Sequence, residues 1–336
     1  MSPSASHTRS RLLKTIPGLL ISAFFLWYTF KGISFSHIRE VRLAHPIGIA
    51  GILAFTLAGY SLRCVRWTRM MRSTGARFGV CARVLMTSIA ANNILPFRIG
   101  DVMRIFTYAP DLGASPSVIL STVILEKLLD IFVLVLMFTA FMGPDVNRHS
   151  RLVAHGLLII SSVGLLVLLL GARTLEPLLR RLFQNTQNAK IKKIEHWLLL
   201  ALDCIRQIGI AGSLLLLVMS IVVWVCEGMI FVSAAYLVGL TSGAAGCWQA
   251  VSVGNLSYLI PSSPGGIGTF EWAVKTSLVS HGASEPQAAL FSLAVHIWLL
   301  VSITAAGGTL FFVHRFRTHD HKPLLEEIET LPVEMP

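Results

Sequence analysis

Residues 213–238 read SLLLLVMSIVVWVCEGMIFVSAAYLV, a long apolar run. The run exceeds the roughly 20 mostly apolar residues that a helix needs to cross a bilayer, and it is too long for a strand of a membrane barrel. Helices and closed barrels are the only backbones whose polar groups are all hydrogen-bonded within lipid. The run therefore predicts a membrane-spanning helix and an all-α fold.

Further apolar runs predict a polytopic membrane protein with about six full spans. The expected spans lie near Lys14–Phe30, Pro46–Leu62, Ser117–Met142, Leu152–Gly171, Ser213–Val238 and Pro286–Val313. The composition of the 336 residues agrees, because 54% are hydrophobic, only 13% are charged and the mean hydropathy is +0.69. Soluble domains do not have this composition. The first span lacks a small-residue cleavage site, which favours an uncleaved anchor.

The formal net charge of +11 informs on topology. Basic residues near span ends stay on the cytoplasmic side, so the charge indicates anionic lipid before it suggests nucleic acid, and we expect no nucleic-acid partner. Four basic clusters share one side if both termini are cytoplasmic. The clusters contain Arg9, Arg11 and Lys14, then Arg63, Arg66, Arg69, Arg72, Arg77 and Arg83, then Arg173, Arg180, Arg181, Lys190, Lys192 and Lys193, then Arg315, Arg317 and Lys322. The exceptions are Lys31, Arg39, Arg42, Arg148 and Arg151.

Two semi-apolar stretches, about residues 84–108 and 248–279, are broken near their middles by proline and glycine. A single crossing by the first would move the basic cluster after span four outside, so the charge distribution predicts re-entrant helical hairpins. The first would enter from the cytoplasm and the second from outside. The expected organisation is a single integral membrane domain over residues 1–313 and a cytoplasmic tail over residues 314–336.

The two broken stretches resemble each other. NNILPFRIGDVMR contains Pro96 and Gly100, and NLSYLIPSSPGGIGTFEW contains Pro264 and Gly268, with the glycine four residues after the proline in each. Related units that enter from opposite faces are what an inverted-topology repeat predicts, and in transporters such broken helices meet near the midplane at the substrate site. The alternative is a chance likeness of two short motifs.

The first broken stretch offers cations for an anionic ligand. Arg98, Asp101 and Arg104 lie on a strongly turning segment, and Asp101 and Arg104 share a face if a helix resumes after Gly100. The two guanidinium groups would hold a phosphate oxygen, with Asp101 fixing one arginine. The alternative is a positive-inside anchor with a local salt bridge.

Span three contains Glu126, Lys127 and Asp130 within an otherwise apolar run, and the two carboxylates share one helix face. An ionisable side chain at such depth costs several kcal/mol unless it is paired or hydrated, so the group predicts a functional interior site. The alternative is a purely structural neutralisation of the arginines. In both cases we expect Glu126 or Asp130 to form an ion pair with Arg98 or Arg104.

The segment IPSSPGGIGTFEWAV is the most specific signal in the second broken stretch. Gly265, Gly266 and Gly268 would let the backbone approach a ligand, and the helix start after Gly268 would favour an anion such as phosphate. No Gly-Lys-Ser/Thr follows, so nucleotide hydrolysis is not implied. The alternative is a tight helix crossing in lipid. Glu271 needs a partner in either case.

The remaining polar residues predict neither a metal site nor a cofactor. The five cysteines form no CxxC pair, and His296, a lone imidazole within span six, fits a packed polar residue better than a ligand. No nucleophile–base arrangement is apparent, so we expect no catalytic residue. The amphipathic stretch at residues 191–209 predicts a helix along the membrane interface, with a soluble partner-binding helix as the alternative.

The blocks LPFRIGDVMR, ILEKLLD and PSSPGGIGTFE together resemble the signature blocks of the lysylphosphatidylglycerol synthase transmembrane family, also called flippase-like proteins. The resemblance covers nearly the whole chain. In bifunctional members this region precedes a soluble aminoacyl-tRNA-dependent transferase domain, for which the residues after Val313 leave no room. The resemblance therefore implies a stand-alone member, and such relatives are linked to phospholipid, hopanoid-lipid or polyprenyl-linked glycan handling.

The resemblance also implies a site and a function. The positions that match the signature blocks are Arg98, Gly100, Asp101, Arg104, Glu126, Asp130, Pro264, Gly265, Gly266, Gly268 and Glu271, and all of them except Gly100 would bind substrate. The implied function is a translocator that moves a phosphate-containing or lipid-linked headgroup between the leaflets of a bacterial plasma (inner) membrane. The alternative is a membrane-embedded transferase or an accessory subunit in lipid or lipid-linked glycan modification. The expected partner is a membrane phospholipid or lipid-linked substrate, and a homo-oligomer or a partner enzyme stays open.

Overall fold

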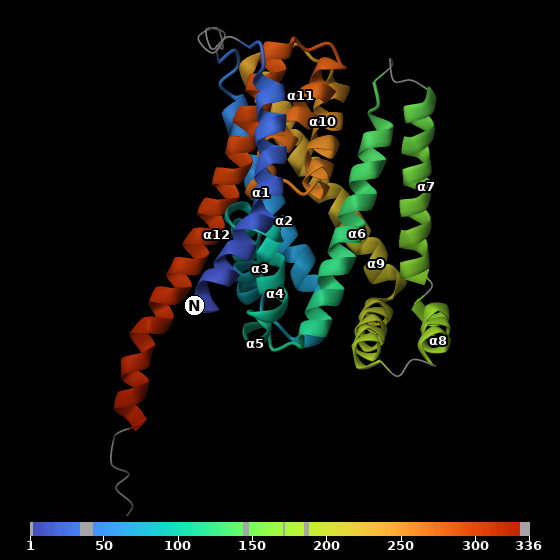
Figure 1. Ribbon diagram of the computed structural model, residues 1–336, viewed down its shortest axis with the longest axis vertical. Coiled ribbons are helices and arrows are strands. Elements are labelled where there is room, and N and C mark those ends of the chain that lie inside the picture. The colour runs from blue at the N-terminus through green and yellow to red at the C-terminus, as the bar shows by residue number, and fades with distance from the viewer. Residues whose placement is uncertain (1–2, 34–42, 144–147, 171, 185–187, 330–336) are drawn as a thin grey trace, which may run out of the picture.

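The computed structural model describes residues 3–33, 43–143, 148–170, 172–184 and 188–329. In these residues the regular structure is helical, with no strand, which confirms the all-α fold (Figure 1). The helices are α1 (Pro3–Phe30), α2 (Gly48–Met70), α3 (Phe78–Ile94), α4 (Ile99–Phe106), α5 (Ala109–Leu112), α6 (Pro116–Ala140), α7 (Arg148–Leu170), α8 (Ala172–Phe183), α9 (Ala189–Val238), α10 (Ala244–Leu256), α11 (Thr269–Val279) and α12 (Glu285–Glu329).

The long helices have the length and apolarity of membrane spans. Within the described residues, three segments are long and apolar enough to cross a bilayer: Gly48–Met70, Arg206–Val238 and Glu285–Phe316. Shorter apolar helices cover Pro17–Phe30, Phe78–Ile94 and Arg151–Leu166. Many large apolar side chains face outward, as lipid contact requires. The chain is therefore a multi-pass membrane protein.

The frame of the bundle is built from α2, α6, α9 and α12. Helix α2 packs along α9, α9 along α6, and α6 along α7, while α12 packs against α3 and α11. Buried Trp67, Leu85 and Leu125 belong to one hydrophobic cluster, and Phe231 and Phe270 belong to a second. In Figure 1, α3, α4 and α5 lie in the lower half of the molecule, and α10 and α11 lie in the upper half.

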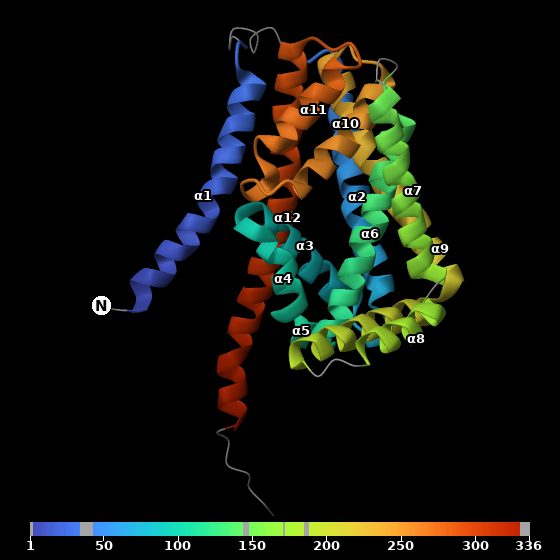
Figure 2. The same cartoon turned by 45° about the vertical axis from the view of Figure 1, so that its right-hand side comes forward.

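Both broken stretches fold into helical hairpins, as the sequence predicts. Helix α4 turns back onto α3, and a Cβ placed on Gly100 would lie 1.9 Å from the carbonyl oxygen of Ser88, so only glycine fits at this contact. Helix α11 likewise packs on α10, with Phe270 and Val274 against Gly254. The hairpins approach from opposite ends of the bundle and their tips meet at mid-height (Figure 2).

One end of the bundle gathers four parts of the chain. The N-terminal end of α1, the C-terminal end of α12, α8 and the beginning of α9 all lie there (Figures 1 and 2). That both termini and the Arg173–Lys193 connection share one side, and that this side is cytoplasmic, stays a prediction. The last helix continues past Val313 to Glu329, so the described part of the predicted tail is helical, and residues 330–336 lie outside the described residues.

Helix α9 has two parts, which meet at Gly209 (φ 70°, ψ 173°). The part before Gly209 contains the amphipathic stretch 191–209 and lies across the end of the bundle beside α8 (Figure 2). The predicted helix is therefore present. Its contact with the membrane interface stays a prediction.

One expectation about the basic clusters is wrong. Helix α2 does not end near Leu62 but continues to Met70, so Arg63 and Arg66 lie inside the bundle rather than in a solvated connection. The Arg66 side chain is only 1% exposed. The physical reason is that carboxylates on α6 and α9 compensate both charges. Arg69, Arg72 and Arg77 are exposed, as expected.

Candidate functional site

A cavity of about 890 Å³ lies where the two hairpin tips meet. This volume is typical of a small-molecule site. Its walls come from both hairpins and from α1, α2, α6, α9 and α12. Leu259, Leu299, Leu300 and Ile303 contribute apolar surface. The charged side chains in the walls are Arg63, Arg98, Glu126, Lys127, Asp130 and Glu227.

The two hairpin tips contact each other directly. The Arg98 guanidinium donates a hydrogen bond to the backbone carbonyl of Tyr258, with 3.2 Å between Nη2 and the oxygen. Phe97 (φ 58°) and Arg98 (φ 52°) both have left-handed backbones, which cost a non-glycine residue roughly 1–2 kcal/mol each. Strained backbone of this kind concentrates at binding sites, where the surrounding structure holds it in place.

Arg98 differs in its partners from Arg63, the other arginine that lines the cavity. In the part of the chain that the structure describes, no carboxylate lies within ion-pairing distance of its guanidinium. Its recorded partner is the neutral carbonyl of Tyr258. The positive charge of Arg98 is therefore available to an anionic ligand in the cavity.

Glu126 forms the expected ion pair with Arg104, which confirms that prediction. The Arg104 side chain is 0% exposed and its guanidinium stacks on Trp67, 4.2 Å from the ring centroid. Among the described residues, its Nε and Nη1 atoms have no hydrogen-bond partner. Arg104 does not line the cavity. The predicted fork of Arg98 and Arg104 around one phosphate is therefore wrong, because burial between α4 and α6 commits Arg104 to Glu126.

Asp130 pairs with Arg66 rather than with Arg98 or Arg104. The distances are 2.6 Å from Nη1 to Oδ1 and 3.2 Å from Nη2 to Oδ2. Trp224 Nε1 donates a further hydrogen bond to Oδ1 at 3.1 Å. The partner residues belong to α2 and α9, which lie beside α6 at this level. The negative charge of Asp130 is therefore compensated without any residue of the first hairpin.

Glu227 is a cavity residue that the sequence reasoning missed. Its Oε2 atom accepts from Arg63 Nη2 at 2.6 Å, and its Oε1 atom accepts from Asn255 Nδ2 at 3.2 Å. The Arg63 guanidinium also lies over Trp224, 4.8 Å from the ring centroid. The available signal was the carboxylate itself, which stands within the apolar run 213–238 and needs a partner there.

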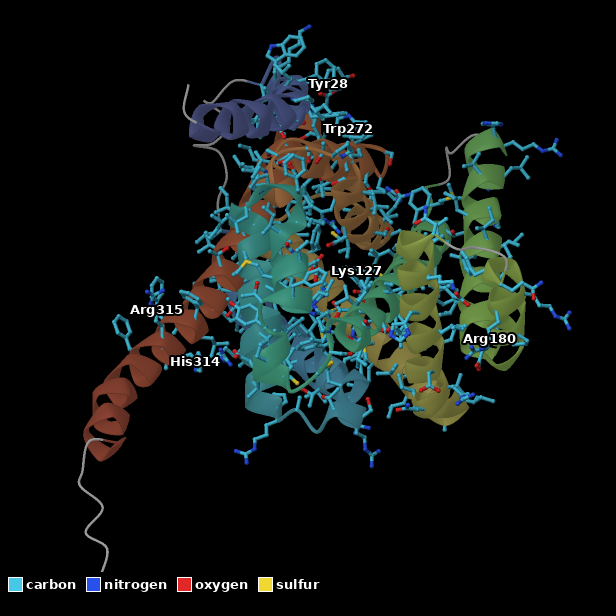
Figure 3. The ribbon with its side chains drawn as sticks, turned by 60° about the horizontal axis from the view of Figure 1, so that its bottom comes forward. Tyr28, Lys127, Arg180, Trp272, His314 and Arg315 are labelled. Atoms are coloured by element: carbon cyan, nitrogen blue, oxygen red, sulfur yellow. The ribbon has the colours of Figure 1, made fainter. Side chains whose placement is uncertain are left out.

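Asp101 does not hold an arginine, contrary to the prediction. It lies 3.6 Å from Lys127 Nζ and accepts a hydrogen bond from Asn92 Nδ2 at 3.1 Å. The turn before α4, at Pro96–Arg98, brings the first turn of α4 and with it Asp101 toward α3 and α6, which accounts for these partners. Lys127, which lines the cavity, lies near the centre of the bundle (Figure 3).

The loop of the second hairpin divides into a wall and a support. Pro264, Gly265 and Gly266 line the cavity, while Gly268 and Glu271 do not. The Gly268 N–H donates to Glu271 Oε2 at 2.7 Å. Glu271 thus supplies the negative charge that a helix start favours, which corrects the prediction of a bound anion at this position.

His296 joins α12 to this loop. Its Nδ1 atom lies 2.7 Å from Glu271 Oε1, and its Nε2 atom lies 2.9 Å from the carbonyl oxygen of Gly265. The Nε2 atom also lies 3.3 Å from the hydroxyl oxygen of Tyr258, so the ring contacts three residues of the second hairpin. The ring also stacks on Phe270 at 4.1 Å. His296 is therefore a packed polar residue, as expected, and it supports the cavity wall from behind.

Comparisons with known proteins agree with this architecture. Residues 16–307 match the family described as "Lysylphosphatidylglycerol synthase TM region". The "Glycosyltransferase AglD" of Haloferax volcanii is 21% identical over 343 aligned positions, which cover 89% of this chain and 54% of that protein. The chain thus spans about half the length of this relative. No solved structure matches the chain.

Proposed function

Because the chain belongs to the family of the lysylphosphatidylglycerol synthase transmembrane region, we propose that it is a membrane lipid translocator. It moves a phosphate-containing or lipid-linked headgroup between the leaflets of a bacterial plasma membrane, with both termini in the cytoplasm. The observation that carries the proposal is Arg98, which faces the cavity between the two hairpin tips and has no described carboxylate partner. A guanidinium binds phosphate oxygens through strong, charge-assisted hydrogen bonds.

The shape of the interior supports this function. Two broken helices that enter from opposite ends provide a polar path where lipid alone would impose a large barrier on a charged headgroup. The cavity has apolar surface from the hairpin tips and α12 beside its ion pairs. A headgroup can therefore occupy the polar part while its acyl chains stay against apolar side chains.

The proposal is tested with purified protein in vesicles that contain a fluorescent phosphatidylglycerol. Wild-type protein is expected to expose the inner-leaflet label to an external quencher, and Arg98→Gln to slow this movement at least about tenfold, because a charge-assisted hydrogen bond to phosphate is lost. Arg98→Lys keeps the charge and should retain more activity. Arg83→Gln is the control, because Arg83 pairs with Asp111 outside the cavity.

The alternative function is a membrane-embedded transferase acting on a lipid-linked substrate. The observation that favours it is the relative named a glycosyltransferase. The two functions separate in one preparation that contains lipid and a sugar donor. Formation of a glycosylated lipid without any movement of labelled lipid would support the transferase and reject the translocator.

A further inference from the structure

We infer that the cavity selects a headgroup with one net negative charge, such as a phosphodiester, over a zwitterionic headgroup and over a diphosphate. The inference rests on the proposed function, because it requires that the headgroup enters the cavity. It follows from the net charge of the cavity wall, which is obtained by assigning each charged wall residue to its ion-pair partner.

Every carboxylate of the cavity wall already has a cation of its own. Glu126, Asp130 and Glu227 each bind a different arginine, and each of these arginines belongs to a neighbouring helix. The three pairs add no net charge to the interior. The walls therefore have no free carboxylate that would attract a cationic headgroup.

The remaining charged wall residues are Lys127 and Arg98. Lys127 lies 3.6 Å from Asp101 and is compensated by it. Arg98 has only the neutral carbonyl of Tyr258 as its recorded partner. Behind the wall, the Glu271 carboxylate accepts from the Gly268 N–H and lies 2.7 Å from His296 Nδ1, so it does not line the cavity and has partners of its own. The described charges of the cavity wall, each taken with its ion-pair partner, thus leave one net positive charge, on Arg98.

A ligand with one negative charge completes this balance. Uncompensated charge is costly in a low-dielectric interior, so a zwitterionic headgroup leaves its cationic group without a carboxylate partner. A diphosphate carries one negative charge too many. It could recruit Lys127 as a second cation only by taking Lys127 from Asp101, whose other recorded side-chain partner is the neutral amide of Asn92.

The experiment compares three labelled lipids with identical acyl chains in the same vesicles. Their headgroups are phosphocholine, phosphoglycerol and a diphosphate-linked glycerol, with net charges of zero, minus one and minus two. Wild-type protein is expected to move the phosphoglycerol lipid at least about tenfold faster than either of the others. Lipid-induced stabilisation against heat in detergent measures the same ranking without transport.

Two variants change the cavity charge in opposite directions. Arg98→Gln removes the net positive charge and should shift the ranking toward the zwitterionic lipid. Glu227→Gln leaves Arg63 without its carboxylate and should shift the ranking toward the diphosphate. The matched controls are Arg83→Gln and Glu176→Gln, which change the charge of the chain equally but lie outside the cavity and should keep the wild-type ranking.

Equal rates for the three lipids would overturn the inference while leaving the translocator intact. A ranking that shifts equally in the controls would also overturn it, because overall charge rather than cavity charge would then be responsible. If wild-type protein moves none of the three lipids, the proposed function fails and the inference fails with it.

Discussion

Arg66 of α2 and Asp130 of α6 form a two-point ion pair in the interior, with distances of 2.6 Å and 3.2 Å. Two residues of α9 complete the contact, because Arg66 donates to Ser220 Oγ at 2.8 Å and Trp224 donates to Asp130 at 3.1 Å. The pair therefore connects three helices at one point. Its removal is expected to affect the whole bundle rather than one helix.

Asp130→Asn leaves Arg66 buried without an anion, so we expect a loss of about 3–5 kcal/mol in the free energy of unfolding. The double variant Arg66→Met/Asp130→Leu removes both charges and should recover most of this loss. Unfolding in detergent measures both. Asp203→Asn is the control, since its pair with Arg206 is exposed and should contribute less than about 1 kcal/mol. A double variant as unstable as Asp130→Asn would show that the loss in the free energy of unfolding comes mainly from packing and not from the unpaired charge.

The Glu126–Arg104 pair predicts a charge-exchange result. Glu126→Arg or Arg104→Glu alone places two like charges together in a buried site, and each should reduce the yield of folded protein and its lipid movement severely. Exchanging both residues should restore part of the yield of folded protein and part of the lipid movement. Recovery stays incomplete because the stacking of the guanidinium on Trp67 is lost. If both single variants fold and move lipid as well as the wild type does, the Glu126–Arg104 pair has no role in stability or in lipid movement.

Gly268 sets how closely α1 approaches the second hairpin. Its φ is +93°, and a Cβ there would lie 2.3 Å from the carbonyl oxygen of Ser22. Gly268→Ala is expected to cost about 1–3 kcal/mol and to make α1 more accessible to protease. The control is Gly308→Ala in α12, where a Cβ meets no atom within 4 Å. Equal protease sensitivity of the two variants would contradict the proposal that the close contact at Gly268 holds α1 in place.

The topology predicts which introduced cysteines react from outside. In a Cys204→Ser background, a cysteine in place of exposed Thr241 should react with a membrane-impermeant reagent in intact cells, since the Gly239–Gly246 connection is expected outside. A cysteine in place of exposed Gln184, the residue directly after α8, should react only after the membrane is permeabilised. Reaction at Gln184 in intact cells would reverse the orientation.

Local signals in the sequence predicted the hairpins and one ion pair. Proline and glycine interrupt a helix wherever it lies, so Pro96 and Pro264 marked both tips, and the burial of Glu126 required a cation nearby. The partners of Asp130 and Glu227 were not predictable in this way. They depend on which helices become neighbours, and that is decided by packing over the whole chain.

Arg66 and Arg98 show why the position of an arginine along the chain predicted the wrong surroundings for its side chain. Arg66 stands near the end of an apolar run, where solvation and continued helix are equally compatible with the residues that follow, and only the carboxylate of Asp130 decides between them. Arg98 and Arg104 look equivalent in the sequence. The left-handed turn at Phe97 and Arg98 directs one to the cavity and leaves the other between helices.

The two arginines of α2 that lie inside the bundle, Arg63 and Arg66, also predict an order of assembly. Their partners are Asp130 on α6 and Glu227 on α9, both of which are synthesised later than α2. An arginine held deep in a helix without a partner costs about 2.5–3.5 kcal/mol during insertion, so we expect α2 to rest first with Arg63 and Arg66 at the water–lipid boundary. We expect it to reach its final depth only when α6 and α9 have joined it. A ribosome that stalls before α9 would therefore leave a nascent chain whose second span is inserted but shallow, which a quality-control protease can recognise.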